Sequence, residues 1–476
     1  MELNRHIIRG YDIRGIVGED LSEDLYTHLG RAYGTIMSKS GTKVVVVGAD
    51  CRETSDIYKA AFIRGIHETG LNTVDIGMVL VGRVYWAQYH FNTKGAAMIT
   101  ASHNPKEFNG IKLASDFSES MIAKELQDMA DIVEKEDYTL TETHGTGKEV
   151  DITAAYFTDL IKKCTVSKPF KVVIDPSCTT AGAIVPNLLR QAGCTVIEQN
   201  CEVSGKFPLG VADPTEEVVA KRLAEGVVEH KADIGFSYDA DGDRIGIVDE
   251  TGQIIWNDVL VALFAKDILH TYPRSSIMYN TLCSKLVSDT IVAEGGEPFM
   301  WRTGHGFLKK KNQDVGAPFI GELSGHFFFS KDFYNHDDGC YATLRLLNYL
   351  SKTGKTLSEE ISALPQYISS PEIKLYCSED KKVALIGKIK PVLESDYPNA
   401  EIIDDERAGD GIRLELPDAM FVIRYSQNGP YITIKFEGKT QVRYTELRKY
   451  LNTLLRSYNE IDWNHTICVN KESLLS

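Results

Sequence analysis

Residues 43–69 read KVVVVGADCRETSDIYKAAFIRGIHET and contain one complete strand–helix pair. The β-branched run 43–47 is typical of a strand that is buried on both faces, because it shows no polar alternation. Over residues 56–69 the apolar side chains recur at the spacing of one helical face. They are Ile57, Ala60, Ala61, Ile63 and Ile66. A strand followed directly by a helix is the building unit of α/β folds.

The same alternation continues along most of the chain. Further strands are predicted at 74–76, 96–99, 171–174, 195–197, 234–238, 276–279 and 298–301. Further helices are predicted at 183–192, 216–229, 258–269 and 285–294. Strands that alternate with helices favour parallel sheets covered by helices.

Breaks in this pattern predict four domains. The polar segment 136–148, a turn at 251–252 and the proline- and serine-containing stretch 364–370 interrupt the alternation. Closely spaced strands follow at 411–416, 421–425 and 431–436, which indicates a smaller α+β unit. The prediction is therefore three similar mixed α/β domains and a C-terminal α+β domain, with bounds 1–147, 148–252, 253–366 and 367–476.

The composition excludes several classes of protein. The chain has 476 residues, of which 43% are hydrophobic and 25% charged, as in soluble globular proteins. A net charge of −15 disfavours nucleic-acid and anionic-membrane partners, because both require a broad basic face. No run approaches the roughly 20 apolar residues of a membrane span, and the N-terminus lacks the apolar core of a signal peptide. The nine cysteines form no Cys-x-x-Cys pair, so we expect reduced thiols and a cytoplasmic location.

A carboxylate loop follows the strand predicted at 234–238. It reads DADGDR over residues 239–244, and Asp239, Asp241 and Asp243 alternate, so their side chains would project to one side. Carboxylate oxygens are the hard ligands that Mg²⁺ or Ca²⁺ prefers, and a phosphate oxygen or water would complete the shell. Arg244 suggests an anion beside the metal. The alternative is a solvated acidic turn.

A serine loop follows the strand predicted at 96–99. It reads TASHNP over residues 100–105 and places Ser102 in a turn where its hydroxyl can be exposed. Ligands of α/β folds bind at the carboxyl ends of strands, and an activated serine can carry a covalent group. The alternative is a polar turn that caps a helix.

Two further loops offer polar groups between glycines. Residues 321–326 read GELSGH, where Glu322 and Ser324 point the same way and suit sugar hydroxyls. Residues 424–431 read RYSQNGPY, which supplies side-chain and backbone donors for a phosphate. The alternatives are a buried turn and an ordinary hairpin turn.

Together and in this order, the four loops resemble the α-D-phosphohexomutase superfamily, in its phosphomannomutase/phosphoglucomutase branch. The serine loop is similar to the family's TASHNP loop, the carboxylate loop to its DGDGDR metal loop with Ala240 as the difference, and residues 321–326 to its GEMSGH sugar loop. Residues 9–15, RGYDIRG, match the family's N-terminal segment, and residues 301–305, WRTGH, resemble the same branch. The resemblance covers essentially the whole chain and implies four domains around a central cleft.

The resemblance implies a mutase that interconverts hexose 1-phosphate and hexose 6-phosphate, with mannose and/or glucose as the sugar. Ser102 would carry the phosphoryl group, and a 1,6-bisphosphate would form in the cleft and also serve as activator. Mg²⁺ would be held by Asp239, Asp241, Asp243 and the phosphate on Ser102. A small-molecule sugar phosphate would be the only partner of a monomer or weak homodimer.

Further roles follow from the same resemblance. Arg14, Lys112 and His326 are the candidates for proton transfer, with Tyr11, His103 and His305 as second candidates. Leu282 stands where the branch often has a lysine, and Lys285 is its candidate substitute. The substrate-binding candidates are Tyr11, Arg244, Lys285, His305, Glu322, Ser324, Arg424, Ser426 and Asn428.

Two alternatives to this function stay open. One is a related mutase for an amino-sugar or pentose phosphate, although Leu323 in the sugar loop disfavours the amino-sugar branch. The other is a catalytically silent homologue that binds sugar phosphates. Retention of Ser102 with all three aspartates disfavours it, because a silent protein has no need of both.

Overall fold

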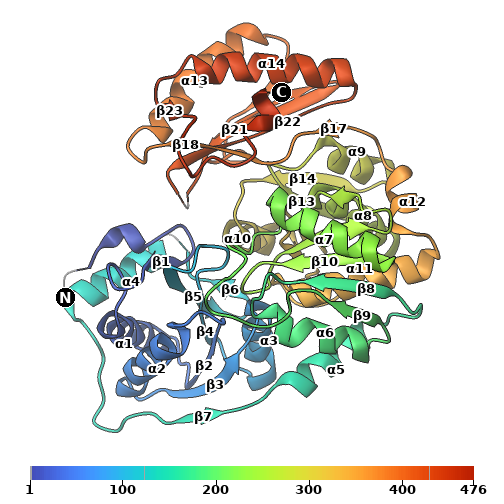
Figure 1. The fold of residues 1–476 in the computed structure, drawn as a ribbon. Helices are drawn as coiled ribbons and strands as arrows, with labels where there is room; N and C mark the ends of the chain where they lie inside the picture. The colour runs from blue at the N-terminus through green and yellow to red at the C-terminus, as the bar shows by residue number, and fades with distance from the viewer. Residues whose placement is uncertain (1–2, 123, 428, 476) are drawn as a thin grey trace. The chain divides into compact units, whose positions relative to one another are not determined.

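The computed structural model describes residues 3–122, 124–427 and 429–475 (Figure 1). Its contacts divide the chain into two compact units. The first unit comprises residues 1–214, 218–254 and 326–357, and the second comprises 215–217, 255–325 and 358–476. None of the described helices is both long and apolar enough to cross a membrane.

The first unit begins with a mixed sheet. Its strands, in spatial order, are β1 (Ile13–Ile16), β5 (Phe108–Asp116), β4 (Gly95–Ile99), β2 (Val44–Ala49), β3 (Asn72–Met78) and β7 (Gly147–Glu149), with β6 (Glu119–Ser120) beside β5. The strands β4, β2, β3 and β7 are parallel, and β5 is antiparallel to β4 and β1. Its helical elements are η1 (Arg5–Ile7), α1 (Glu23–Lys39), α2 (Ser55–Glu68), α3 (Val81–Phe91) and α4 (Lys124–Lys135).

The continuous valine run of β2 is explained by helices on both faces of this sheet. Val45 and Val47 pack in one core with α1, α2 and α4. Val46, between them, points to the opposite face and is also fully buried. The apolar run therefore belongs to a central strand that is buried on both faces, as the sequence predicts.

A second sheet belongs to the same unit. Its strands, in spatial order, are β12 (Ile254–Ile255), β11 (Ile245–Asp249), β10 (Ile234–Tyr238), β8 (Lys171–Asp175) and β9 (Thr195–Glu198). The strands β10, β8 and β9 are parallel, whereas β11 returns antiparallel to β10. The remaining elements of the unit are α5 (Thr153–Lys163), α6 (Ala181–Gln191), α7 (Glu217–His230), β16 (Phe327–Phe328) and α11 (Gly339–Thr353).

The second unit combines a parallel and an antiparallel sheet. Its parallel strands are β14 (Glu297–Trp301), β13 (Ser276–Asn280) and β15 (Ile320–Gly321). Its antiparallel sheet contains β19 (Glu401–Ile403), β20 (Gly411–Leu416), β21 (Ala419–Tyr425), β22 (Tyr431–Gly438), β18 (Ile373–Cys377) and β23 (Ile461–Asp462), with β17 (Ile368–Ser369) beside β22. The helices are α8 (Asn257–Thr271), α9 (Lys285–Ala293), α10 (His305–Val315), α12 (Leu357–Ser362), α13 (Lys382–Asp396), α14 (Gln441–Arg456) and α15 (Glu472–Leu475).

The predicted class, mixed α/β domains with a C-terminal α+β domain, is confirmed. The parallel sheets expected from the alternation are mixed in the first unit, because the loops after β4 and β10 are too short for a crossover and form hairpins. The polar segment 136–148, which interrupts the predicted alternation, ends in a strand, since Gly147 pairs with Thr73 of β3. The four domain boundaries remain a prediction.

Candidate active site

Ser102 lies in the hairpin loop between β4 and β5. It is 3% exposed, and its φ of 50° is in the left-handed region that non-glycine residues seldom occupy. Its hydroxyl donates to Asp239 Oδ2 at 2.7 Å, and its backbone N–H donates to Thr100 Oγ1 at 2.9 Å. A conformation of this kind persists only where the surroundings hold it.

Arg52, just after β2, is the residue that holds this loop. Its buried guanidinium donates to four backbone carbonyl oxygens of the loop, those of Ser102, Asn104, Pro105 and Phe108, at 2.7 to 3.0 Å. Its Nε pairs with Asp50 at 3.1 Å, and Asp50 also accepts the hydroxyl of Thr100 at 2.8 Å. Neither Asp50 nor Arg52 was predicted from the sequence as a residue of the site. Their position at the end of a central strand was the available signal.

The three aspartates lie in the hairpin loop between β10 and β11. All three are buried, and one oxygen from each lies within 4.8 Å of the others. Burial and the negative charge of Asp243 raise the pKa of Asp239 well above its usual value. Burial opposes ionisation of Asp241 as well, but Lys112 outweighs it and lowers the pKa of that carboxyl.

This cluster fits a divalent cation. The Oδ1 atoms of Asp241 and Asp243 are buried and have no hydrogen-bond partner among the described residues. Buried carboxylate oxygens without a partner are costly. Oxygen-only ligands are the set that Mg²⁺ and Ca²⁺ prefer. The triad can therefore bind a metal ion, as the sequence predicts.

Three cations surround the serine and the carboxylates. Lys112, on β5, contacts Asp243 at 2.5 Å and Asp241 at 2.9 Å. Burial alone would lower the pKa of Lys112, but the two carboxylates raise it well above its usual value. Arg244 contacts Asp239 at 3.1 Å and Asp213 at 3.4 Å. Both cations therefore remain charged at neutral pH.

Arg14, on β1, completes the cationic group. Its guanidinium pairs with Asp12 at 2.7 Å and donates to Asn104 Oδ1 at 2.9 Å and to the carbonyl oxygen of Ala101 at 3.2 Å. Arg14 thus contacts Ala101 and Asn104, the residues on either side of Ser102 and His103. Burial opposes the charge of Arg14, but Asp12 and its neighbours raise the pKa of the guanidinium.

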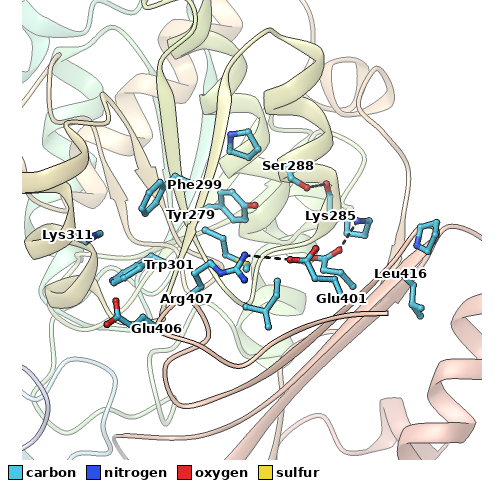
Figure 2. A pocket seen from close by; sticks show the side chains of 15 residues that line it. Tyr279, Lys285, Ser288, Phe299, Trp301, Lys311, Glu401, Glu406, Arg407 and Leu416 are labelled. Carbon is cyan, nitrogen blue, oxygen red and sulfur yellow. Dashed lines mark hydrogen bonds and ion pairs between the residues drawn. The ribbon is translucent and has the colours of Figure 1, made fainter. Parts of the chain in front are cut away.

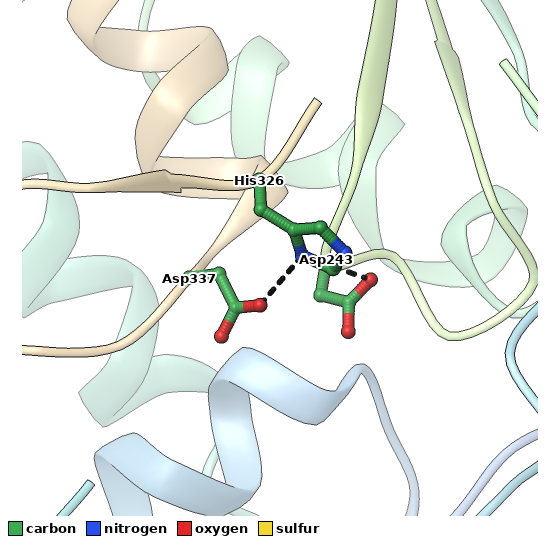
Figure 3. A group of neighbouring side chains, drawn as sticks. All are labelled: Asp243, His326 and Asp337. Atoms are coloured by element: carbon green, nitrogen blue, oxygen red, sulfur yellow. Dashed lines mark hydrogen bonds and ion pairs between the residues drawn. The ribbon is translucent and has the colours of Figure 1, made fainter. Parts of the chain in front are cut away.

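The predicted histidines and Tyr11 occupy different settings. His326 is buried, and its Nδ1 lies 2.6 Å from Asp337 Oδ2 and 3.7 Å from Asp243 Oδ1 (Figure 3). The Nδ1 of His103 lies 3.2 Å from the Ser102 hydroxyl. Tyr11 lies half-buried before β1, close enough to Arg14 to influence its charge. Asp337 was not predicted from the sequence.

Glu322 and Ser324, the residues predicted to bind sugar hydroxyls, are in contact with each other in the second unit. The Oε1 of Glu322 accepts from the backbone N–H of Gly304 at 3.2 Å, and its Oε2 accepts from the Ser324 hydroxyl at 3.1 Å. Gly304 immediately precedes His305, the buried first residue of α10. These three predicted residues therefore lie together.

Arg424 and Ser426 lie at the end of β21. Arg424 makes two ion-pair contacts with Asp410, one of them from Nε at 2.7 Å. Burial opposes the charge of Arg424, but Asp410 raises the pKa of its guanidinium. Ser426 is buried, and its carbonyl oxygen accepts from Lys382. Asn428 lies outside the described residues.

Lys285 lies at the start of α9 in the wall of a cavity of about 720 Å³ (Figure 2). Its Nζ pairs with Glu415 at 2.7 Å. Tyr279, Phe299 and Trp301 form an aromatic part of the same wall. Leu282, in contrast, is buried. The lysine side chain is thus directed to an internal ion pair.

Comparisons with known proteins agree with this geometry. The sequence matches the family described as phosphoglucomutase/phosphomannomutase, alpha/beta/alpha domain I, over residues 5–140, domain II over 154–252 and domain III over 256–367. The phosphomannomutase/phosphoglucomutase of Pseudomonas aeruginosa is 35% identical, with 95% of this chain and 96% of that one covered. The phosphoglucomutase of Neisseria gonorrhoeae is 31% identical over 97% and 99% of the two chains.

A comparison with solved structures indicates the same family. A phosphoglucomutase/phosphomannomutase family protein from Burkholderia thailandensis superposes with a TM-score of 0.87 and 29% identity, over 96% of this chain and 98% of that one. These matches confirm the superfamily predicted from the sequence, the α-D-phosphohexomutases. The chain belongs to the phosphoglucomutase/phosphomannomutase family, and it is a mutase.

Proposed function

We propose that this mutase transfers a phosphoryl group between O1 and O6 of glucose or mannose, with Ser102 as its covalent carrier. The observation that carries the proposal is the hydrogen bond from the Ser102 hydroxyl to Asp239, within a buried group of carboxylates and fixed cations. The names of the relatives from P. aeruginosa and N. gonorrhoeae support glucose and mannose phosphates as substrates.

The transfer exchanges one P–O bond for another. The bond between phosphorus and Ser102 Oγ breaks while a bond to the attacking sugar hydroxyl forms, and the reverse step uses the other phosphate of the bisphosphate. Arg14, Lys112 and Arg244 supply positive charge around the serine, which stabilises the transferring group. Asp239, Asp241, Asp243 and the phosphate on Ser102 would hold Mg²⁺, which neutralises charge on the phosphoryl oxygens when bound.

His326 is the residue that we assign to proton transfer. Arg14 has a raised pKa and remains protonated, so it cannot accept a proton at neutral pH. The Nδ1 of His326 lies 2.6 Å from Asp337 Oδ2, and this contact holds the ring beside Asp243, where it can accept the proton of the sugar hydroxyl. His103, beside Ser102, is the second candidate.

The proposal assigns recognition of the rest of the substrate to the second unit. Glu322 and Ser324 bind ring hydroxyls, with His305 as a further contact; Tyr11, in the first unit, is the one exception. Arg424, Ser426 and Asn428 bind the phosphate that is not reacting, because a guanidinium can bind phosphate through two hydrogen bonds. The proposal also includes a cytoplasmic monomer or weak homodimer, which size-exclusion chromatography with light scattering tests.

A coupled assay tests the reaction. Glucose 1-phosphate, mannose 1-phosphate and glucosamine 1-phosphate are compared with Mg²⁺ and a trace of glucose 1,6-bisphosphate. We expect conversion of the first, the second or both. Conversion of the amino sugar alone would favour the alternative mutase, and no conversion of any of them would reject the proposal.

A further inference from the structure

Asp243, His326 and Asp337 form a compact group of metal-ligating side chains beside the aspartate triad. One ligand atom from each lies within 4.8 Å of the others, and all three residues are buried (Figure 3). The His326 Nδ1 lies between the two carboxylates, 2.6 Å from Asp337 and 3.7 Å from Asp243. A single cation could bind all three side chains after small shifts of these side chains.

The two oxygens of Asp243 face different neighbours. Its Oδ2 contacts Lys112 at 2.5 Å, whereas its Oδ1 is the atom directed toward His326. That Oδ1 is buried and has no hydrogen-bond partner among residues 3–122, 124–427 and 429–475. A buried carboxylate oxygen without a partner is an available ligand, because coordination would recover the free energy lost on burial.

The backbone fixes the three ligands relative to one another. His326 forms an antiparallel bridge with Arg244, the residue after Asp243, and Asp337 forms a second bridge with Phe328. Each ligand is therefore within one residue of, or part of, a hydrogen-bonded backbone pair. Ligands held in this way lose little conformational freedom when they bind an ion.

We propose that Asp243, His326 and Asp337 form a second cation site that prefers Zn²⁺, Co²⁺ or Mn²⁺ to Mg²⁺. An imidazole nitrogen with two carboxylate oxygens is a donor set for borderline first-row cations. Mg²⁺ instead prefers oxygen ligands and water, and the aspartate triad offers the oxygen-only set. The two sites would share Asp243 as a bridging carboxylate.

Occupation of this site would change the contacts of His326. A cation on Nδ1 would take the place of the direct contact between Nδ1 and Asp337. The ring that the proposed function assigns to proton transfer would then be held by the cation. Binding itself does not depend on the proposed function, whereas any effect on the reaction does.

Cobalt supplies a direct probe of the site. The metal-free full-length protein is saturated with Mg²⁺ and titrated with Co²⁺, and the visible absorption of protein-bound Co²⁺ is recorded. We expect one equivalent to bind despite excess Mg²⁺, and Zn²⁺ to displace it. His326→Gln and Asp337→Asn should each weaken this binding by about 10- to 100-fold, as expected when a group that binds or orients at a metal is lost.

Two variants separate this site from its surroundings. His336→Gln is the matched control, because His336 is a buried neighbouring histidine whose Nδ1 contacts Ser118 at 2.9 Å and is not among the three ligands. We expect it to bind Co²⁺ as the wild type does. Asp239→Asn removes a ligand of the aspartate triad only. This variant should still bind one equivalent of Co²⁺ in the presence of excess Mg²⁺.

Two results would overturn the inference. One is Co²⁺ that binds only in competition with Mg²⁺ and is lost in Asp239→Asn, which would mean a single site at the triad. The other is unchanged Co²⁺ affinity in both His326→Gln and Asp337→Asn. If those variants do not fold, ring ¹⁵N spectra of the wild type decide: a histidine signal that shifts with one Zn²⁺ equivalent supports the site, and no shift rejects it. An inactive wild type that still binds Co²⁺ would reject the proposed function alone.

Discussion

The serine and metal loops of the first unit differ from the loops of the second unit in how their charges are held. In the first unit Ser102, the three aspartates, Lys112 and Arg244 are linked by contacts into one buried network. In the second unit the ion pairs are small and separate: Arg424 pairs with Asp410, and Lys285 and Arg413 share Glu415.

This contrast predicts which part of the proposed reaction each unit affects. A network whose members fix one another is preorganised for charge that develops during the transfer. Separate ion pairs position single groups, whose loss weakens ground-state and transition-state binding alike. We therefore expect substitutions in the first unit to act mainly on kcat and those in the second unit mainly on KM.

The largest expected effect is that of Ser102→Ala. Without the carrier oxygen no phosphoenzyme can form, so kcat/KM should fall by at least about 10³-fold. Intact-mass measurement of the protein incubated with glucose 1,6-bisphosphate should show one phosphatase-sensitive phosphate on the wild type and none on the variant.

Ser177→Ala is the matched control for this substitution. Ser177 is also buried, also follows a central strand and also has a positive φ, of 54°, but its hydroxyl contacts Arg222. It should retain the labile phosphate and most of the activity. A phosphate that persists in Ser102→Ala would show that another residue is the carrier.

The second effect is that of Arg52→Lys, which tests the support of the serine loop. A lysine ammonium cannot replace contacts to four carbonyl oxygens and Asp50, so Ser102 should lose its fixed position. We expect kcat to fall by about 10- to 100-fold, as for a misplacement of about 1 Å, while KM changes little. The phosphate occupancy of Ser102 should fall in parallel.

Arg345→Lys controls for the loss of a buried arginine. Arg345 is buried, pairs with Asp332 at 2.6 Å and lies in α11 of the same unit, away from the serine loop. Its replacement should lower the melting temperature without changing kcat. If Arg52→Lys lowered only the melting temperature, Arg52 would support the fold and not the reaction.

A smaller effect is expected from Arg424→Lys in the second unit. Lysine keeps the charge but loses the two-pronged geometry that Asp410 fixes, so phosphate binding should weaken. We expect KM to rise by about 10-fold, which corresponds to about 1.4 kcal/mol, with kcat nearly unchanged. An equal fall in kcat with constant KM would contradict the proposed division between the units.

The sequence predicted the strands and the loops that follow them better than the partners of the loop residues. The bounds of β10 and β20 match the prediction, because their apolar runs are bounded by turn residues. Ser102 and the three aspartates were found because their spacing within one loop carries information. The antiparallel return of β5, which brings Lys112 to the aspartates, has no comparable local pattern.

The missed residues are single counter-charges that are distant in sequence. Asp50, Asp213 and Asp337 contact Arg52, Arg244 and His326 respectively. An isolated aspartate has the same local appearance whether it lies at the surface or neutralises a buried cation. Only the three-dimensional fold distinguishes these cases.

The smallest effect is expected from Lys285→Met, which tests a predicted substrate ligand whose ammonium is held in an ion pair. The Lys285 ammonium is neutralised by Glu415, whose pKa is lowered by Arg413 and Lys285 against the opposing effect of burial. Arg413 also contacts Glu415 at 2.5 Å, so the carboxylate stays paired in the variant. We expect KM for glucose 1-phosphate and mannose 1-phosphate to change by less than about twofold. The reason is that Lys285, while paired with Glu415, contacts the substrate in neither the ground state nor the transition state. A rise in KM as large as that of Arg424→Lys would show that Lys285 leaves Glu415 to bind substrate, and would restore it as the substitute for the lysine absent at Leu282.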